Sequence, residues 1–189
     1  MNKKADDRLK KVTKIFEDTI QESCKITEEQ FLCKTITLQN CRPVEKIKLM
    51  YEVENRFASI SYNLILQSVY TRKEHAAYEF ELQYGGMVHI KNAVFVCKSG
   101  NETQQDERAK EILQILNDPL VVKKITDLNL LQAEIHYSME RKCWRIRIKS
   151  MIGSSTWILI PPVMHTIMPK GREIYALLEV MRMLQCAIQ

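Results

Sequence analysis

The sequence contains few residues that interrupt regular structure and no long apolar run. Only five of the 189 residues are glycine and five are proline, while 46% are hydrophobic and 27% are charged. This composition excludes a fibrous or disordered chain and predicts an ordinary folded protein. The most apolar window, residues 157–168, is interrupted by Pro161, Pro162 and His165. Because a membrane-spanning helix needs about 20 apolar residues, we expect no membrane span.

Motifs that bind metals or cofactors are also missing. The six cysteines include no Cys-x-x-Cys pair, and the spacings of nine and eight residues from Cys24 to Cys33 to Cys41 do not suit a zinc site. The glycine-rich phosphate loops Gly-x-x-x-x-Gly-Lys and Gly-x-Gly-x-x-Gly do not occur. We therefore expect no metal and no cofactor. Because no apolar signal region follows the first residues, we expect free thiols in an intracellular compartment, cytoplasmic or nuclear.

No catalytic signature is present. The sequence has neither a Gly-x-Ser-x-Gly elbow nor a cysteine-protease signature. His89 and His136 fall inside predicted strands, where a histidine is usually a polar group on a sheet surface. We assign no catalytic residue, and the sequence favours a protein that is not an enzyme.

Length and charge leave the class of partner open. A chain of 189 residues suits a single domain, residues 1–189, with two smaller lobes, 1–128 and 129–189, as an alternative division. The formal charge of +5 is mild. It neither requires nor excludes a nucleic-acid partner.

The first part of the chain predicts an amphipathic helix. Over residues 5–23, Leu9, Val12, Phe16 and Ile20 recur at spacings of three and four. Its start is crowded with cations, namely Lys3, Lys4, Arg8, Lys10, Lys11 and Lys14. The segment beginning at Thr27 then resembles a capping box for a second, shorter helix. The β-branched residues 35–37 would suit a strand equally well.

From residue 46 the apolar period changes to two, which predicts strands. Residues 47–53 and 58–66 form two adjacent antiparallel strands, and residues 78–84 and 87–97 form a second pair around a tight turn at Gly85 and Gly86. These four strands are expected to form a meander. A helix capped at Asn101 or Thr103 follows and reaches about residue 116, and Asp118 restarts a short helix through residue 125.

The last third repeats this plan with three strands and a helix. Strands are expected at 131–137, 142–150 and 156–160, with a turn at 153–155 between the last two. A loop over 161–169 leads into a helix over 171–188. The fold class is therefore α+β. We expect a largely antiparallel sheet of two meanders, of about four and three strands, each followed by a helix, with an amphipathic helix at the N-terminus.

The strand around residue 144 carries a candidate polyanion site. Alternation places Trp144, Ile146 and Ile148 on the core face. The opposite face and the preceding turn carry a row of cations, Arg141, Lys142, Arg145, Arg147 and Lys149. Such a row either grips phosphates or is neutralised by acidic residues of neighbouring strands. Glu79, Glu81, Glu134 and Glu140 are the candidates for that neutralisation.

A second candidate anion site lies at the start of the last helix. Lys170, Gly171 and Arg172 bring two cations and free backbone N–H groups to a helix N-terminus. The alternative is an incidental loop, because no phosphate-loop motif accompanies these residues.

The sequence leaves three hypotheses about function. The leading one is a non-catalytic intracellular module that binds another macromolecule, a protein partner or a second copy in a homodimer. The second is a nucleic-acid-binding protein that uses the basic strand and the basic N-terminal helix. The third is a small-ligand-binding protein or enzyme with a pocket between sheet and helices, near His136 or His165.

Overall fold

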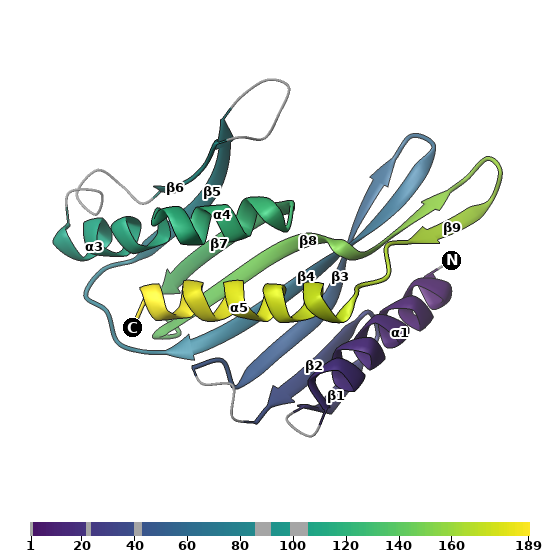
Figure 1. The fold of residues 1–189 in the computed structure, drawn as a ribbon, viewed down its shortest axis with the longest axis horizontal. Coiled ribbons are helices and arrows are strands. Elements are labelled where there is room, and N and C mark those ends of the chain that lie inside the picture. The colour runs from purple at the N-terminus through teal and green to yellow at the C-terminus, as the bar shows by residue number, and fades with distance from the viewer. Residues whose placement is uncertain (1, 22–23, 40–42, 86–91, 99–105) are drawn as a thin grey trace. The chain divides into compact units, whose positions relative to one another are not determined.

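The computed structural model describes residues 2–21, 24–39, 43–85, 92–98 and 106–189 (Figure 1). In this part of the chain four helices and nine strands form an α+β fold with an antiparallel open sheet and an N-terminal helix, as predicted. The chain divides into two compact units. Unit 1 comprises residues 1–67 and 149–175, and unit 2 comprises residues 68–148 and 176–189.

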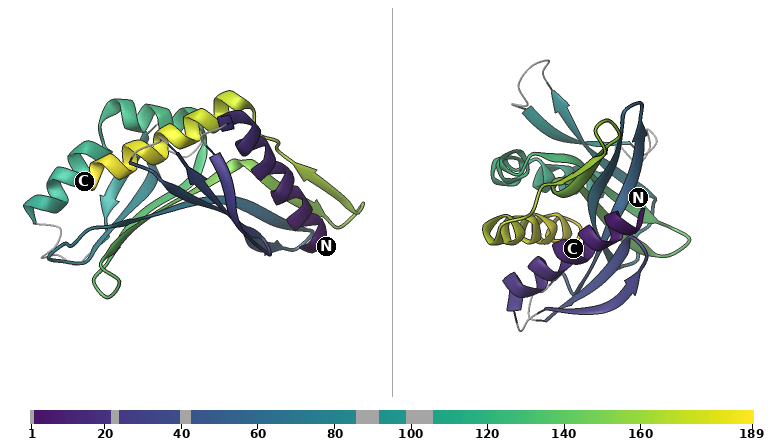
Figure 2. Two further views of the ribbon diagram at one scale, coloured as in Figure 1. Left: turned by 90° about the horizontal axis from the view of Figure 1, so that it is seen from below. Right: turned by 90° about the vertical axis from the view of Figure 1, so that its right-hand side faces the viewer.

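Unit 1 combines the N-terminal helix with antiparallel hairpins. Its elements are α1 (Asn2–Ile20), β1 (Cys24–Gln30), β2 (Cys33–Leu38), β3 (Lys46–Arg56), most of β4 (Ser59–Thr71), the second half of β8 (Cys143–Ile158) and β9 (Val163–Thr166). The helix packs on β1, β2 and β3 (Figure 2). Its buried residues include Leu9, Val12 and Phe16, which confirms the predicted apolar face.

Unit 2 contains the other helices. Its elements are the end of β4, β5 (Tyr78–Gly85), β6 (Asn92–Cys97), α3 (Glu107–Leu116), α4 (Pro119–Asp127), β7 (Leu130–Ser138), the first half of β8 and most of α5 (Gly171–Ala187). The predicted restart at Asp118 is confirmed, because its side chain accepts the backbone N–H of Leu120. Asp106 caps α3. The predicted caps Asn101 and Thr103 and the predicted strand residues 87–91 lie outside the described residues.

The core of unit 2 is built around Trp144. Its ring stacks on Tyr78 and Phe80 and is tilted against Tyr137. The indole N–H donates to Glu74 across 3.2 Å. Ile146 and Ile148 are buried beside it. The inward face predicted for this strand is therefore confirmed.

The order of the strands differs from the predicted pair of meanders. The sheet order is β1-β2-β3-β4-β8-β7-β5-β6, with β9 paired to β8. The neighbour of β4 is thus β8 rather than β5, so β3 to β6 do not form one meander. Between β4 and β5 lie residues 72–77, a connection longer than a tight turn, and alternation within a strand carries no information on which strand will pair with it.

The capping-box segment at Thr27 is a strand rather than a helix. β1 and β2 form an antiparallel hairpin in which Ile26 lies opposite Ile36. The hydroxyl of Thr27 lies 3.2 Å from that of Thr37 across the hairpin. The strand interpretation of residues 35–37 is therefore the correct one, because cross-strand pairing outweighs a local capping signal.

The predicted turn at 153–155 is also wrong. β8 runs without a break from Cys143 to Ile158, and the reversal occurs at residues 159–162, before β9. Gly153 sits inside β8 with φ of +85°. Its N–H donates to the carbonyl of Ile167 at 2.7 Å, and the N–H of Ile167 donates to Ser154 at 3.0 Å. A glycine within a strand often marks such a local distortion of the ladder.

Candidate functional site

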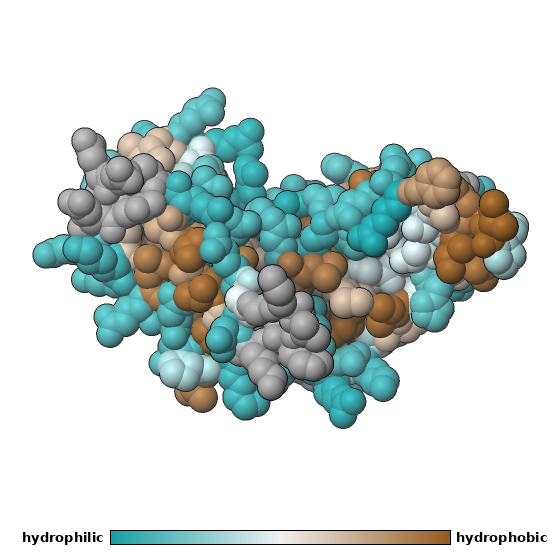
Figure 3. Space-filling view, turned by 90° about the horizontal axis from the view of Figure 1, so that it is seen from above, coloured by the Kyte–Doolittle hydropathy of each residue, from teal (hydrophilic) through white to brown (hydrophobic). Residues whose placement is uncertain are grey.

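The most unusual surface of unit 1 is the tip of the β8–β9 hairpin. Six consecutive residues, Ile158 to Val163, are all apolar and all exposed. Ile160 is 87% exposed to solvent. Phe57, in the turn between β3 and β4, is fully exposed. We call these seven residues the apolar tip. Figure 3 shows hydrophobic residues gathered over the ends of these hairpins, at the right of the view.

Backbone pairing holds the two turns of the apolar tip together. Trp157 lies opposite Met164 and Ile158 opposite Val163 in the β8–β9 ladder. The N–H of Leu159 donates to the carbonyl of Ala58 at 3.0 Å, which joins this hairpin to the β3–β4 turn. The apolar residues thus lie at the ends of paired strands and in the two turns that connect them.

The base of the β8–β9 hairpin is anchored in the core of unit 1. The buried hydroxyl of Tyr51 donates to the carbonyl of Gly153 at 2.7 Å. Ser155 lies 3.2 Å from the same hydroxyl and 2.8 Å from the hydroxyl of Thr166 on β9. Burial raises the pKa of Tyr51 to about 12, despite the nearby Ser155 and Arg8. Tyr51 therefore remains a neutral donor at physiological pH.

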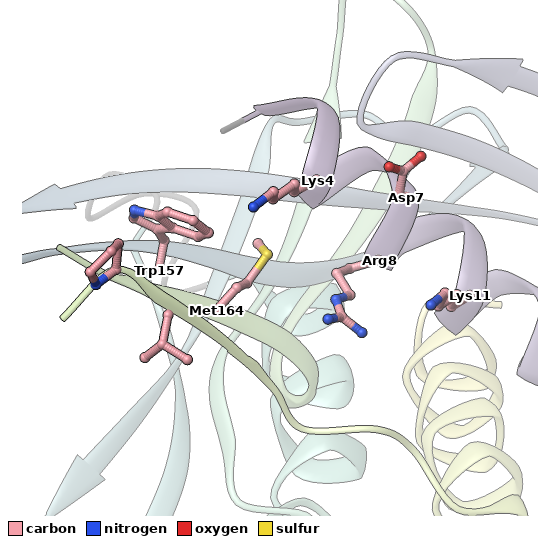
Figure 4. A pocket seen from close by; sticks show the side chains of 8 residues that line it. Lys4, Asp7, Arg8, Lys11, Trp157 and Met164 are labelled. Atoms are coloured by element: carbon pink, nitrogen blue, oxygen red, sulfur yellow. The ribbon is translucent and has the colours of Figure 1, made fainter. Parts of the chain in front are cut away.

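A groove lies between α1 and the β8–β9 hairpin (Figure 4). It has a volume of about 390 Å³. We call it the α1 groove, and its lining residues are Lys4, Asp7, Arg8, Lys11, Trp157, Pro162, Val163 and Met164. The ammonium group of Lys4 lies 5.0 Å from the centre of the Trp157 ring, a cation–π contact. The groove therefore combines three cations and one carboxylate with an apolar wall.

A buried ion pair ties α1 to the β1–β2 hairpin. Asp6 on α1 accepts hydrogen bonds from the N–H of Leu32 at 2.9 Å and from the ammonium of Lys34 at 3.1 Å. Burial alone would raise the pKa of Asp6. The hydrogen bonds from Leu32 and Lys34, with the charges of Lys34 and Lys10, outweigh burial and leave that pKa lowered. The carboxylate is therefore charged at neutral pH and ties the helix to β2.

The basic row on β8 is partly neutralised within the fold. Arg147 forms an ion pair of 3.4 Å with Glu134, one of the acidic residues suggested by the sequence. Lys149 pairs with Glu52 at 2.8 Å and with Glu54, both on β3. These two carboxylates were missed, because the pairing crosses β4, whose position beside β8 the sequence does not reveal.

The other members of the row are more accessible. Arg145 is half-buried, and Arg141 and Lys142 are exposed in the turn before β8. Among the described residues Arg145 has no ion pair. The row therefore presents fewer available charges than its sequence implies, and the polyanion site remains a prediction.

The start of α5 already holds a carboxylate. The backbone N–H of Lys170 donates to Glu173 at 2.7 Å, as in a capping box. Gly171 packs close to Thr19 of α1, and Arg172 is exposed. An anion bound at Lys170, Gly171 and Arg172 would have to displace Glu173. This candidate site also remains a prediction.

A polar cluster in unit 2 was not predicted. The hydroxyl of Tyr78 donates to Asp106 at 2.5 Å, and His75 lies 2.8 Å from the same carboxylate. The hydrogen bond from Tyr78 comes first among the contacts that lower the pKa of Asp106. Because Asp106 also caps α3, the cluster has a structural role at that helix end. Asp106 lies 28 residues after Tyr78, so the sequence gave no sign that it joins Tyr78 and His75.

Those histidines and cysteines that the structure describes do not gather into a metal site. His136 and His165 are exposed, neither lines the α1 groove, and His89 lies outside the described residues. The part of the chain that is described contains no group of three metal-ligating side chains. Cys41 is not among the described residues. The free cysteines are Cys24, Cys33, Cys97, Cys143 and Cys186.

None of the described helices is long and apolar enough to cross a membrane.

Comparison with protein-family models shows which family the chain belongs to. Residues 18–188 match the family model DUF3156, whose description reads "Protein of unknown function". The chain belongs to this family. No curated protein and no solved structure matches it. The matched residues include the whole apolar tip, whereas Lys4, Asp7, Arg8 and Lys11 precede them.

The apolar tip had a signal in the sequence. Eight apolar residues run from Trp157 to Met164, with two prolines in the middle. Too short for a membrane span, the run was expected to form a strand end and a loop. In the β8–β9 hairpin, residues 158–163 are exposed rather than packed in the core. Phe57, about 100 residues earlier in the chain, lies near them because Leu159 donates a hydrogen bond to Ala58.

Proposed function

We propose that the protein is a non-catalytic interaction module that docks on another macromolecular surface through the apolar tip. The observation that carries this proposal is the run of six exposed apolar residues beside the fully exposed Phe57. Single exposed apolar residues are ordinary on soluble proteins, but contiguous ones mark interaction surfaces. Covering a large apolar side chain contributes about 1.5 to 3 kcal/mol. A partner that covers Phe57 and Ile160 would therefore gain substantial affinity.

The hydrogen bonds that support the tip favour the same function. Tyr51 and Gly153 bond at the base of the hairpin, and Leu159 bonds to Ala58 at its turn. A preorganised surface loses less conformational entropy on binding than a free loop does. A protein partner, a second copy of this chain and a lipid surface would all cover such a tip. They differ in the charge that they present to the α1 groove.

The test compares two variants of the full chain. The tip variant carries Phe57→Ser and Ile160→Ser. The control carries Leu120→Ser, which removes an exposed apolar side chain from α4 in unit 2. Light scattering reports self-association, and the protein and lipid that copurify with each variant are identified.

We expect the wild type and the control to share an association that the tip variant loses, with unfolding curves unchanged. The proposal fails if the tip variant keeps every association of the wild type. It also fails if the wild type is a monomer with neither protein nor lipid retained.

A further inference from the structure

Cationic side chains adjoin the apolar tip. Pro162 and Val163 belong to the tip and also line the α1 groove, together with Lys4, Arg8 and Lys11. The last two cations follow Lys4 by one and two helical turns, so all three lie on one side of α1. Asp7 is the one carboxylate among the lining residues. The apolar and cationic surfaces are therefore continuous.

Trp157 lies where these two surfaces meet. It stands in the β8–β9 ladder next to the apolar tip, partly exposed, with Lys4 over its ring. Figure 4 shows Lys4 and Arg8 extending from α1 toward Trp157 and Met164. Tryptophan and lysine side chains are typical of the boundary between hydrocarbon and polar headgroups, because each joins an apolar part to a polar end.

The β8–β9 turn of the apolar tip presents few unpaired backbone N–H groups. An unpaired N–H is costly in hydrocarbon. In the turn of residues 159–162, Leu159 already donates its N–H to Ala58 at 3.0 Å, and Pro161 and Pro162 have no N–H to satisfy. Three of the four turn residues therefore carry no free donor into an apolar phase.

Charge distinguishes the occupants that could cover this surface. A second copy joined tip to tip would bring the same three cations and one carboxylate to this surface, and so would add net positive rather than negative charge. An anionic lipid surface suits both parts of this surface. Its acyl chains can cover Phe57 and Ile160, and its negative headgroups can contact the three cations. We infer that the apolar tip inserts into the headgroup boundary of an anionic bilayer while the cations of the α1 groove contact its lipid headgroups. This inference rests on the docking role proposed for the tip and names its partner.

The experiment measures sedimentation of the full-length protein with two kinds of vesicle. One kind is phosphatidylcholine alone, and the other contains phosphatidylserine as well. We expect binding to the anionic vesicles that weakens with added salt, because surface attraction is screened. Binding to the neutral vesicles should be much weaker.

Two sets of variants separate the apolar and cationic contributions. The tip variant, Phe57→Ser with Ile160→Ser, should lower partitioning to anionic vesicles at least about tenfold. The groove variant, Lys4→Gln with Arg8→Gln and Lys11→Gln, should lower it about a hundredfold, or about fivefold for each cation. The matched control, Lys25→Gln with Lys46→Gln and Lys48→Gln, removes three exposed cations of the same unit and should change it less than about fivefold.

Fluorescence tests the orientation directly. Lipids with brominated acyl chains quench tryptophans that approach the hydrocarbon. We expect quenching of wild-type protein and its loss in Trp157→Phe, because the other tryptophan, Trp144, is buried in unit 2.

Two results would overturn the lipid inference. One is a wild type that stays in the supernatant with both kinds of vesicle. The other is a groove variant and its lysine control with equal losses. If a tip-dependent protein complex or self-association persists in either case, the docking role stands and only the lipid partner is wrong. If the tip variant matches the wild type in every assay, the docking role fails as well.

Discussion

The ammonium group of Lys34 on β2 donates a hydrogen bond to the carboxylate of Asp6 on α1 across 3.1 Å, and both residues are buried. The same carboxylate oxygen accepts the N–H of Leu32, and Lys34 also donates to the carbonyl of Gln30 at 2.7 Å. The pair therefore joins the helix that carries the groove cations to the β1–β2 hairpin.

The first prediction concerns the loss of this pair. Asp6→Ala would leave the Lys34 ammonium buried without its counter-ion, and we expect the free energy of unfolding to fall by about 3 to 5 kcal/mol. Urea denaturation measures the change. Asp7→Ala, at the exposed neighbouring position, should change it by less than about 0.5 kcal/mol. Equal effects of the two substitutions would show that the pair does not stabilise the fold.

The second prediction is a dependence of stability on pH. The pKa of Asp6 is lower in the folded protein than its ordinary value, which is about 3.9 in an unfolded chain. Its contribution is therefore complete above about pH 4 and is lost as the pH falls through that value toward the folded pKa. Denaturation between pH 7 and pH 3 should show a steeper acid loss for the wild type than for Asp6→Asn. Parallel curves would contradict this account.

The third prediction concerns Gly153. A Cβ atom there would lie 2.5 Å from Cδ2 of Leu64, and φ is +85°. We expect Gly153→Ala to lower the free energy of unfolding by about 2 to 5 kcal/mol, because it adds a steric clash to an unfavourable backbone angle. Gly171→Ala is the control. Its Cβ would meet Thr19 at an ordinary 3.5 Å, so the change should be less than about 1 kcal/mol. A tolerated Gly153→Ala would show that β8 can relax at this position.

The fourth prediction addresses the basic row of β8. Arg147 and Lys149 already pair with carboxylates. We therefore expect Arg147→Gln with Lys149→Gln to leave single-stranded nucleic-acid affinity and its salt slope unchanged. A site that grips phosphates would instead lose about 0.7 unit of slope for each cation removed. Titration over a range of salt concentrations distinguishes the two outcomes, and a reduced slope would support the polyanion hypothesis.

Predictions that depend on interactions between residues near in sequence were correct, whereas one that depends on pairing between strands was wrong. Alternation placed Trp144 in the core correctly, because successive side chains of any strand point to opposite faces. The cap at Asp118 was found for a similar reason, since capping depends on neighbouring residues. At Thr27 the local capping signal was misleading, because pairing between β1 and β2 decided the conformation.

The candidate site was less predictable than the fold. The sequence showed that Ile160 belongs to an apolar run, but it did not show that Ile160 is exposed. An apolar hairpin that no other element covers has the same sequence pattern as the end of a buried strand. Phe57 joins it through the contact between Leu159 and Ala58. Lys4 comes from the opposite end of the chain.

The sequence by itself determined the α+β class, the inward face of β8 and the amphipathic helix α1, because these follow from backbone periodicity and local capping. Only the tertiary structure decided that β8 lies beside β4, that Lys149 is paired with Glu52, and that the cations of α1 adjoin the apolar tip. The physical reason is that strand pairing and helix docking bring together residues far apart in the chain, and no local pattern encodes those contacts.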